Sequence, residues 1–346
     1  MAKNVSLQII ADSLGISRGT VDRAIHGRGR ISTETRERVL AEARRLGYID
    51  RKVESFLPLQ QAKVLIAVIP GGDPFFEKIE EGIKKAVNEM NPSPELELVN
   101  IQLDNPELQS EYLLSVSRRN LECCGLIVVP SEDPILKDAI NEVENSGVRV
   151  AALNTDAPES GRSLFIGQDL YASGRAAGEL MLKMNNESTV ILSGFDNIWA
   201  HSERVRGFQD VYRESGRLHD LIGPYYTHDN ISETGLILQN LPDRFSGVYS
   251  VSGLTTEGAG RKLQDSNIDD VTLVGFDCTE ANIKLLKDGY ISCLISQSPQ
   301  LQGYLSARRL MSVVNGELPA ADGEIRIPID IYFKENIDFY LNHLEL

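Results

Sequence analysis

The chain has 346 residues and a net charge of −15 at pH 7, with 42% hydrophobic and 25% charged residues. This length allows a small domain beside one large or two medium domains. No apolar run approaches the roughly 20 residues that a membrane helix needs, and the polar N-terminus leads directly into a predicted helix. We therefore expect a cytoplasmic protein with no export signal and no membrane partner.

The charge is unevenly distributed along the chain. Residues 1–52 carry 11 Lys/Arg and 6 Asp/Glu, a net charge of +5, so the remaining 294 residues carry −20. A basic segment attached to an acidic remainder is typical of a protein in which one small part contacts nucleic acid phosphate. The acidic remainder should be repelled by DNA.

Residues 6–48 have the pattern of a helix-turn-helix. Ser6, Ser17 and Ser32 each stand where a residue can cap a helix, and Gly15 stands where a helix end often needs a left-handed residue. Three short helices with a tight corner between the first two describe a unit that reads the DNA major groove. A generic three-helix cap is the alternative, and the local positive charge disfavours it. The three apolar faces are Leu7, Ile10, Ala11 and Leu14; Thr20, Val21, Ala24 and Ile25; and Val39, Leu40, Ala43 and Leu46.

From residue 63 onward, short apolar runs alternate with amphipathic stretches. This alternation predicts parallel sheets with helices on both faces, in two doubly wound α/β units separated near Asp156–Ser163. The predicted strands are Val64–Ile69, Leu96–Ile101, Gly125–Val129, Val148–Leu153, Thr189–Leu192, Gly247–Val251 and Thr272–Val274. The predicted helices are Phe76–Met90, Ser110–Asn120, Pro134–Ser146, Tyr171–Met184, Val205–Ser215, Thr256–Asp265 and Glu280–Lys287.

Polar and aromatic residues follow the ends of these strands. Ligands of open α/β sheets bind beyond the carboxyl ends of the strands, so two facing units define a cleft lined by these loops. Aromatic rings stack on the C–H faces of sugars, while carboxylates, amides and arginine bond their hydroxyls. The loops begin at Pro70, Pro130, Asn154, Gly194, Ser252, Gly275 and Ile295.

Metal and catalytic sites are not expected. Cys123, Cys124, Cys278 and Cys293 lack metal-ligand spacing and lie in or beside apolar runs, as buried thiols do. The sequence contains neither a phosphate-binding loop with its lysine nor a Gly-x-Ser-x-Gly elbow. We expect no cofactor and no enzyme activity. An enzyme or a sugar-binding protein on the same α/β fold is the alternative.

The basic N-terminal segment (the head) and the α/β remainder of the chain (the body) together resemble the lactose/purine-repressor (LacI) family of bacterial transcription regulators. The specific segments are Ile9–Arg23, Arg30–Val39 and Leu46–Ile49, and the body resembles periplasmic sugar-binding proteins of the ribose type through residues 73–76, Arg204 and residues 274–277. The resemblance implies a helix-turn-helix at 1–50, a hinge at 51–61 and an effector-binding body at 62–346. It places one subdomain at about 62–158 plus 297–325 and the other at about 159–294 plus 327–346.

The resemblance also implies roles in the head. Arg18 and Gly19 fall at base-reading positions, Arg23 falls where a guanine edge is contacted, and Asp22 would orient an arginine or contact a cytosine. In the hinge, Leu57 falls at the position of a minor-groove wedge. Glu54 and Pro58 depart from the family pattern, so an apolar linker that docks on the body is the alternative there. The expected phosphate and backbone contacts are Ser6, Ser17, Thr20, His26, Arg28 and Arg30.

The effector cleft is expected from the same resemblance. Phe75 and Phe76 have core packing as their alternative, and Asp277 has a plain turn as its alternative. Three acids against one arginine favour an uncharged sugar or polyol over a phosphorylated one. We expect a homodimer that acts as a repressor on a palindromic double-stranded operator. The expected lining is Asp73, Phe75, Phe76, Glu132, Asn154, Arg204, Asp277 and Gln297, with Trp199, His201, Ser252 and Leu254 as second choices.

Overall fold

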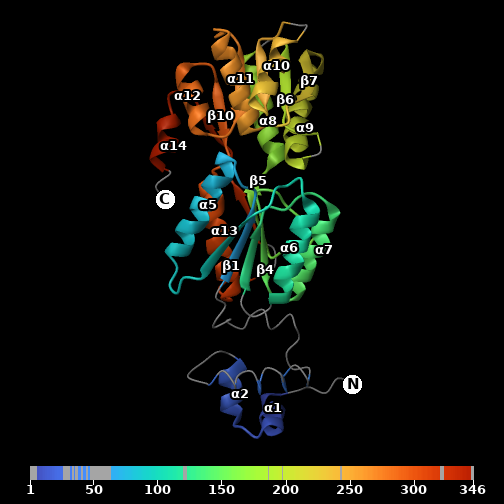
Figure 1. The fold of residues 1–346 in the computed structure, drawn as a ribbon, viewed down its shortest axis with the longest axis vertical. Helices are drawn as coiled ribbons and strands as arrows, with labels where there is room; N and C mark the ends of the chain where they lie inside the picture. Colours follow the sequence, from blue (N-terminus) through green and yellow to red (C-terminus); the bar gives the residue numbers. More distant parts are fainter. Residues whose placement is uncertain are drawn as a thin grey trace.

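The computed structural model describes residues 6–25, 32, 35, 38–39, 42–43, 46, 64–119, 123–185, 187–196, 198–241, 244–319 and 323–343. Two α/β lobes follow an N-terminal head, so the predicted fold class is confirmed (Figure 1). Along the ranges that are described, no helix is long and apolar enough to cross a membrane. The predicted hinge at 51–61, with Leu57, lies outside these ranges, as do His26, Arg28 and Arg30.

The head contains α1 (Leu7–Leu14) and α2 (Arg18–Ile25), joined by the corner that the sequence predicted. Gly15 is left-handed, with φ 65°, and the Ser17 hydroxyl accepts the backbone N–H of Thr20 at 3.1 Å. Ser6 holds the N-cap position of α1, but its side chain makes no capping bond, so the predicted side-chain cap is wrong there. Helical residues 35, 38–39 and 42–43 supply Val39 and Ala43 to the buried cluster of the head.

Lobe 1 is built on a six-stranded parallel sheet with helices on both faces. The strand order is β11-β5-β4-β3-β1-β2. Helices α5 and α13 cover one face and α6 and α7 the other. Its strands are β1 (Val64–Ile69), β2 (Glu95–Asn100), β3 (Cys123–Val128), β4 (Arg149–Leu153), β5 (Leu164–Gln168) and β11 (Gly323–Ile327). Its helices are α5 (Pro74–Asn88), α6 (Pro106–Arg119), α7 (Pro134–Asn145) and α13 (Pro299–Val314).

Lobe 2 repeats this plan, with the order β12-β10-β9-β8-β6-β7 and a single antiparallel pairing, between β10 and β12. Its strands are β6 (Thr189–Ser193), β7 (Leu221–Tyr226), β8 (Gly247–Ser250), β9 (Thr272–Phe276), β10 (Cys293–Ser296) and β12 (Asp330–Tyr332). Its helices are α8 (Leu170–Met184), α9 (Trp199–Glu214), α10 (Ile231–Gln239), α11 (Gly253–Asp265), α12 (Glu280–Asp288) and α14 (Ile337–His343), with a 3-10 turn at Leu218–Asp220.

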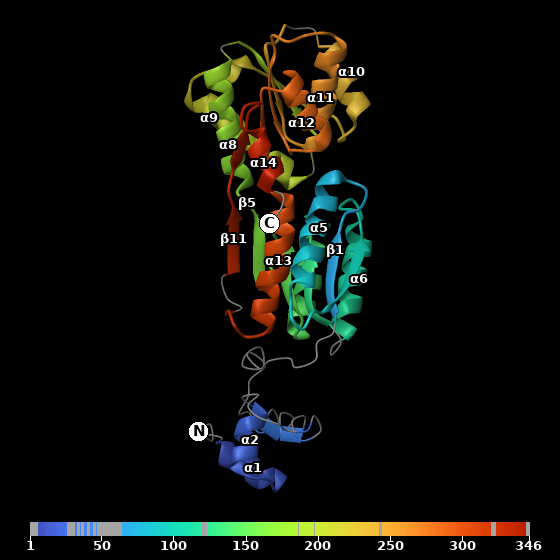
Figure 2. The ribbon, with the colours of Figure 1, turned by 90° about the vertical axis from the view of Figure 1, so that its left-hand side faces the viewer.

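The chain passes between the lobes three times. The first passage follows β5, which pairs with β4 and β11 in lobe 1, so the subdomain boundary lies after Gln168 and not near 158 as the sequence predicted. The predicted boundary was wrong because the run Leu164–Gln168 was not recognised as a strand. The later passages follow β10 and β11. Figure 2 shows α13 and β11, although late in the sequence, in the same lobe as β1.

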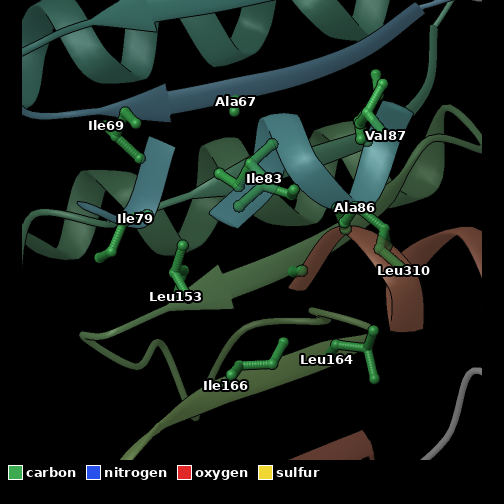
Figure 3. Close-up of a cluster of buried hydrophobic side chains, with 14 of the residues drawn as sticks. Ala67, Ile69, Ile79, Ile83, Ala86, Val87, Leu153, Leu164, Ile166 and Leu310 are labelled. Atoms are coloured by element: carbon green, nitrogen blue, oxygen red, sulfur yellow. The ribbon is translucent and has the colours of Figure 1, made fainter. Parts of the chain in front are cut away.

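Each lobe is held by a close helix pair with glycines at the contact. In lobe 1, α5 and α13 meet at Gly82 and Gly303, where an added Cβ would lie 2.0 Å from a backbone oxygen of the other helix. In lobe 2, α8 and α9 meet in the same way at Gly174 and Gly207. Figure 3 shows the core beneath the first pair, where side chains of α5, α13 and the strands pack together. These contacts fix the helices that carry cleft residues.

We predict that Gly174→Ala lowers the free energy of unfolding by about 1–3 kcal/mol, because the new methyl must displace α9. Its Cβ would lie 2.1 Å from the backbone oxygen of Arg204. Gly235→Ala on α10 is the control, since the nearest atom to its Cβ is 3.9 Å away. Alanine should stabilise that helix by about 0.5–1 kcal/mol. Urea unfolding of both variants measures this, and equal effects would contradict the packing argument.

Candidate functional site

A chain of hydrogen bonds joins the two lobes where strands end. Asn154 follows β4 in lobe 1, and its amide donates to Gln297 Oε1 at 3.3 Å. Gln297 follows β10, and its Nε2 donates to Asp277 Oδ1 at 2.8 Å. Asp277 follows β9 in lobe 2 and, like Asn154, has a left-handed backbone, with φ near 65°. The structure therefore brings three of the predicted cleft residues together.

Arg204, one turn inside α9, adds a buried positive charge to this cluster. Its side chain is 3% exposed, lies over the ring of Phe276 at 4.0 Å and donates to the Val251 carbonyl at 2.8 Å. Burial lowers the pKa of the guanidinium, and the negative charges of Asp277 and Asp229 partly offset that effect. Within the described part of the chain, its buried Nε has no hydrogen-bond partner.

Asp229 also belongs to the cluster, although the sequence did not predict it. It follows β7 with φ 51°, and one of its oxygens accepts the hydroxyls of Ser252 and, at 3.0 Å, of Thr255. Its other oxygen is 4.0 Å from Nε2 of His201. The rule that ligand groups follow strand ends applies to Asp229 too, but β7 itself had not been predicted.

His201 is neutral at pH 7 in this setting. The residue is 7% exposed, and burial lowers its pKa to about 4, against the opposing effect of Asp229. Nδ1 accepts the backbone N–H of Phe195 at 3.1 Å, so the single proton of the neutral ring is on Nε2, facing Asp229. The imidazole therefore supplies a hydrogen-bond donor without a charge.

Carboxylates dominate the electrostatics of the polar cluster between the lobes. Asp73 caps α5 by accepting the Phe75 N–H at 2.8 Å, and its pKa is raised by burial and by the nearby Asp229. Burial also raises the pKa of Asp277 to about 6, although Arg204 and the Gln297 hydrogen bond lower it. These acids and Arg204 form a site rich in acceptors, which suits a ligand with several hydroxyl donors.

Glu132 has a different position from the one expected of a ligand contact. It follows β3 in lobe 1, and its carboxylate accepts the backbone N–H groups of Trp199 and Ala200 at the start of α9 in lobe 2. Ile198, at the N-cap of α9, makes no side-chain cap bond of its own. Glu132 thus caps a helix of the opposite lobe, where the helix dipole favours a negative charge. The Trp199 side chain is 45% exposed.

The remaining predicted cleft residues lie nearer the cores of the lobes. Phe75 is 8% exposed and belongs to the buried cluster of lobe 1, and Phe76 packs against that cluster with its ring edge-on to Phe75. Core packing, the alternative left open for this pair, therefore applies to Phe75. Leu254 is half-buried in the first turn of α11. Among the described residues, no group of His, Cys, Asp or Glu could hold a metal ion.

The head presents the start of α2 to solvent. Arg18, Gly19 and Arg23 are exposed, while Thr20 and Asp22 are half-buried. Arg23 folds back, and its Nε donates to the Gly19 carbonyl at 3.0 Å. The Ser17 and Thr20 hydroxyls are 2.8 Å apart. Arg18 therefore projects from the first turn of α2, where a major-groove helix makes its base contacts.

Two lobes with a polar cluster between them, behind a helix-turn-helix, define a ligand-binding body joined to a DNA-binding head. Residues 64–318 match the family described as periplasmic binding protein domain, and residues 6–50 match that described as bacterial regulatory proteins, lacI family. The chain therefore belongs, through its body, to the family of periplasmic binding protein domains, and its head is a DNA-binding domain of the lacI family. The resemblance drawn from the sequence is confirmed.

Relatives of both kinds match most of the chain. The HTH-type transcriptional regulator RafR of Escherichia coli is 24% identical over 323 residues, covering 91% of this chain and 94% of RafR. The HTH-type transcriptional regulator CelR of Thermobifida fusca is 22% identical, covering 90% and 92%. The ribose import binding protein RbsB of Escherichia coli is 25% identical over 277 residues, covering 78% of this chain and 90% of RbsB.

Solved structures share the fold. A solute binding protein from Bacillus halodurans with bound myo-inositol has a TM-score of 0.72 at 22% identity, covering 81% of this chain and 97% of that protein. A LacI transcriptional regulator from Bacteroides fragilis has a TM-score of 0.70 at 21% identity, covering 81% and 100%. Both likenesses establish the two-lobed architecture of the body.

We predict that Asp277→Asn stabilises the empty protein at pH 7. Because the pKa of Asp277 is about 6 in the fold and ordinarily 3.8, its contribution to stability is present at low pH and lost as the pH rises between these values. The difference corresponds to at most about 3 kcal/mol. His201, with a pKa of about 4, has the opposite pH dependence in both proteins. The stability of the variant relative to the parent should therefore rise from pH 4 to pH 6.

Urea unfolding at a series of pH values measures this difference. Asparagine keeps an oxygen for Gln297 and tolerates the left-handed backbone, so little else changes at residue 277. The exposed Asp104→Asn is the control and should show no such rise. A constant difference between Asp277→Asn and the parent across this pH range would show that Asp277 is not strained by its burial.

Proposed function

We propose that this lacI-family regulator senses a small neutral sugar or polyol in the interlobe cleft and thereby changes its affinity for an operator. The observation that carries the proposal is a polar cluster to which both lobes contribute. Arg204, Asp277 and Gln297 are buried in it, and Asp229 and Asn154 are half-buried. The sugar-binding names of several relatives agree with it, as does the bound myo-inositol of one structural neighbour.

The charge of the cluster favours a ligand without phosphate. Asp73, Asp229 and Asp277 accept hydrogen bonds from hydroxyls but would repel a phosphate, and Arg204 is the cation among them. Arg204 already donates to Val251 and faces two of these acids. Neutral His201 adds a donor and no positive charge. Hydroxyl groups would satisfy these acceptors in place of water.

Ligand binding would act on DNA through the angle between the lobes. A ligand held by both lobes favours one interlobe angle, and linkage requires that operator and effector alter each other's affinity equally. We propose a homodimer that places two heads on a palindromic operator, as half-site spacing requires. In this reading the chain acts in the cytoplasm, probes the duplex with Arg18 and catalyses no reaction.

We predict that titration calorimetry of the full chain detects binding of at least one neutral sugar or polyol. The first probes are D-ribose, D-arabinose and myo-inositol, followed by ribose 5-phosphate. Asp277→Asn should weaken the binding by about 10- to 100-fold, the effect of losing a hydrogen bond to a charged group. The exposed Asp104→Asn should bind as the parent does. Binding of the phosphorylated sugar alone would contradict the proposal.

We predict steeply salt-dependent DNA binding that requires Arg18. A fluorescent duplex selected by the full chain from random sequences provides the probe for anisotropy titrations. Neutralising 6–10 phosphates would reduce affinity by about 10³–10⁵ between 50 and 200 mM salt. Arg18→Ala should cost about 1–3 kcal/mol of binding free energy if Arg18 reads a base. Arg206→Ala, an exposed change in the body, is the control. Binding insensitive to salt would refute a phosphate-contacting head.

A further inference from the structure

The three passages between the lobes are tied together by one side chain. Gln168 ends β5 at the first passage and is 1% exposed. Its Nε2 donates to the carbonyl of Ser296, at the second passage, at 3.0 Å. The same nitrogen donates to the carbonyl of Pro328, at the third passage, at 2.9 Å. One amide group therefore uses both of its protons to hold the other two passages.

The chemistry of this position selects a carboxamide. Both partners are carbonyl oxygens, so the atom between them must be the nitrogen and not Oε1. A glutamate would place negative oxygen against both carbonyls, and an apolar side chain would leave them without these bonds. The amide is neutral and can be buried without the large desolvation penalty of an ammonium or guanidinium group.

The Ser296 carbonyl that Gln168 holds is also adjacent in sequence to the polar cluster. Ser296 precedes Gln297, whose side chain bonds Asn154 and Asp277. Ser298 follows with a left-handed backbone, φ 47°, and its N–H donates to the Ser296 hydroxyl at 3.0 Å. The Gln297 carbonyl accepts the side-chain amide of Gln302 at 2.8 Å. A change at Gln297 therefore reaches the Gln168 contact through a single residue.

We propose that Gln168 is a positioning residue of the hinge: it makes the three passages move as one unit, and so couples effector binding to the interlobe angle without contacting the ligand. The coupling to DNA rests on the proposed function, whereas the control of the interlobe angle does not. Gln168 is buried where the chain passes from lobe to lobe, with its amide nitrogen against the carbonyls of the other two passages.

The decisive experiment measures interlobe separation in the full chain without any ligand. Labels placed by Leu108→Cys on α6 and Leu236→Cys on α10 report from lobe 1 and lobe 2, since both side chains are exposed. Pulsed dipolar EPR then compares the parent with Gln168→Met, which keeps side-chain length and removes the amide. The chain without the two labelling substitutions shows any background from the native thiols.

Gln109→Met is the matched control. Gln109 is also fully buried, and its amide donates to the Val129 carbonyl at 2.9 Å, but both groups lie inside lobe 1. We expect Gln168→Met to broaden the distance distribution and shift it to other separations, and Gln109→Met to leave it unchanged. An unchanged distribution for Gln168→Met, or equal changes in both variants, would overturn the proposal. If Gln168→Met does not fold, Gln168→Asn is measured in its place, because the shorter side chain withdraws the amide by one methylene.

A second readout separates this inference from the proposed function. With a selected duplex and a neutral sugar that binds, the ratio of DNA affinities with and without sugar measures the coupling. Gln168→Met should reduce that ratio by about fivefold or more, at the lower end of typical allosteric couplings. For Gln109→Met, the ratio of DNA affinities with and without sugar should equal that of the parent. If no sugar or DNA binds, the proposed function fails, while the EPR comparison still decides the role of Gln168.

Discussion

The structure depends on the burial of one guanidinium group at the boundary of two lobes. An isolated charge of this kind is too costly to bury, so its surroundings must compensate it. The Val251 carbonyl, the ring of Phe276 and the carboxylates of Asp277 and Asp229 do so for Arg204. The ionised form of Asp277 is itself disfavoured, because burial raises its pKa to about 6. Arg204 is therefore held by groups whose own burial is only partly offset by its charge.

Parallel sheets explain why this cluster forms at one place. In each lobe the carboxyl ends of the strands face the boundary, so residues far apart in sequence, such as Asn154 and Asp277, meet there. The helices that carry or flank them are held by glycine contacts, with α8 against α9 at Gly174 and Gly207. Backbone contact leaves little freedom for Arg204 on α9. The position of the Arg204 side chain is thus fixed by glycine contacts between helices and not only by its own hydrogen bond.

The sequence predicted those parts of this arrangement that depend on short stretches of neighbouring residues. Apolar runs such as Val64–Ile69 revealed most central strands, and the loops after them contained Asp277, Gln297 and Asn154. Strand β7 escaped notice because Gly223-Pro224 interrupts a half-exposed edge run and reads as a turn, so Asp229 was missed with it. Glu132 was chosen for its chemistry, but its partners are backbone N–H groups of the other lobe. No local pattern encodes such a contact.

The polar cluster and the second passage between the lobes both include Gln297, so they are adjacent along the chain. Gln297 belongs both to the polar cluster and to the second passage, and the preceding Ser296 carbonyl is held by Gln168. A ligand that competes for Gln297 or Asp277 therefore acts on the hinge itself, without a long path through packed side chains. Glu132, in lobe 1, adds a carboxylate to the N-terminus of α9, the helix that also carries Arg204. Hydrogen bonds between the lobes thus occur both at the passages and at the start of α9, so a change in the interlobe angle must alter both sets.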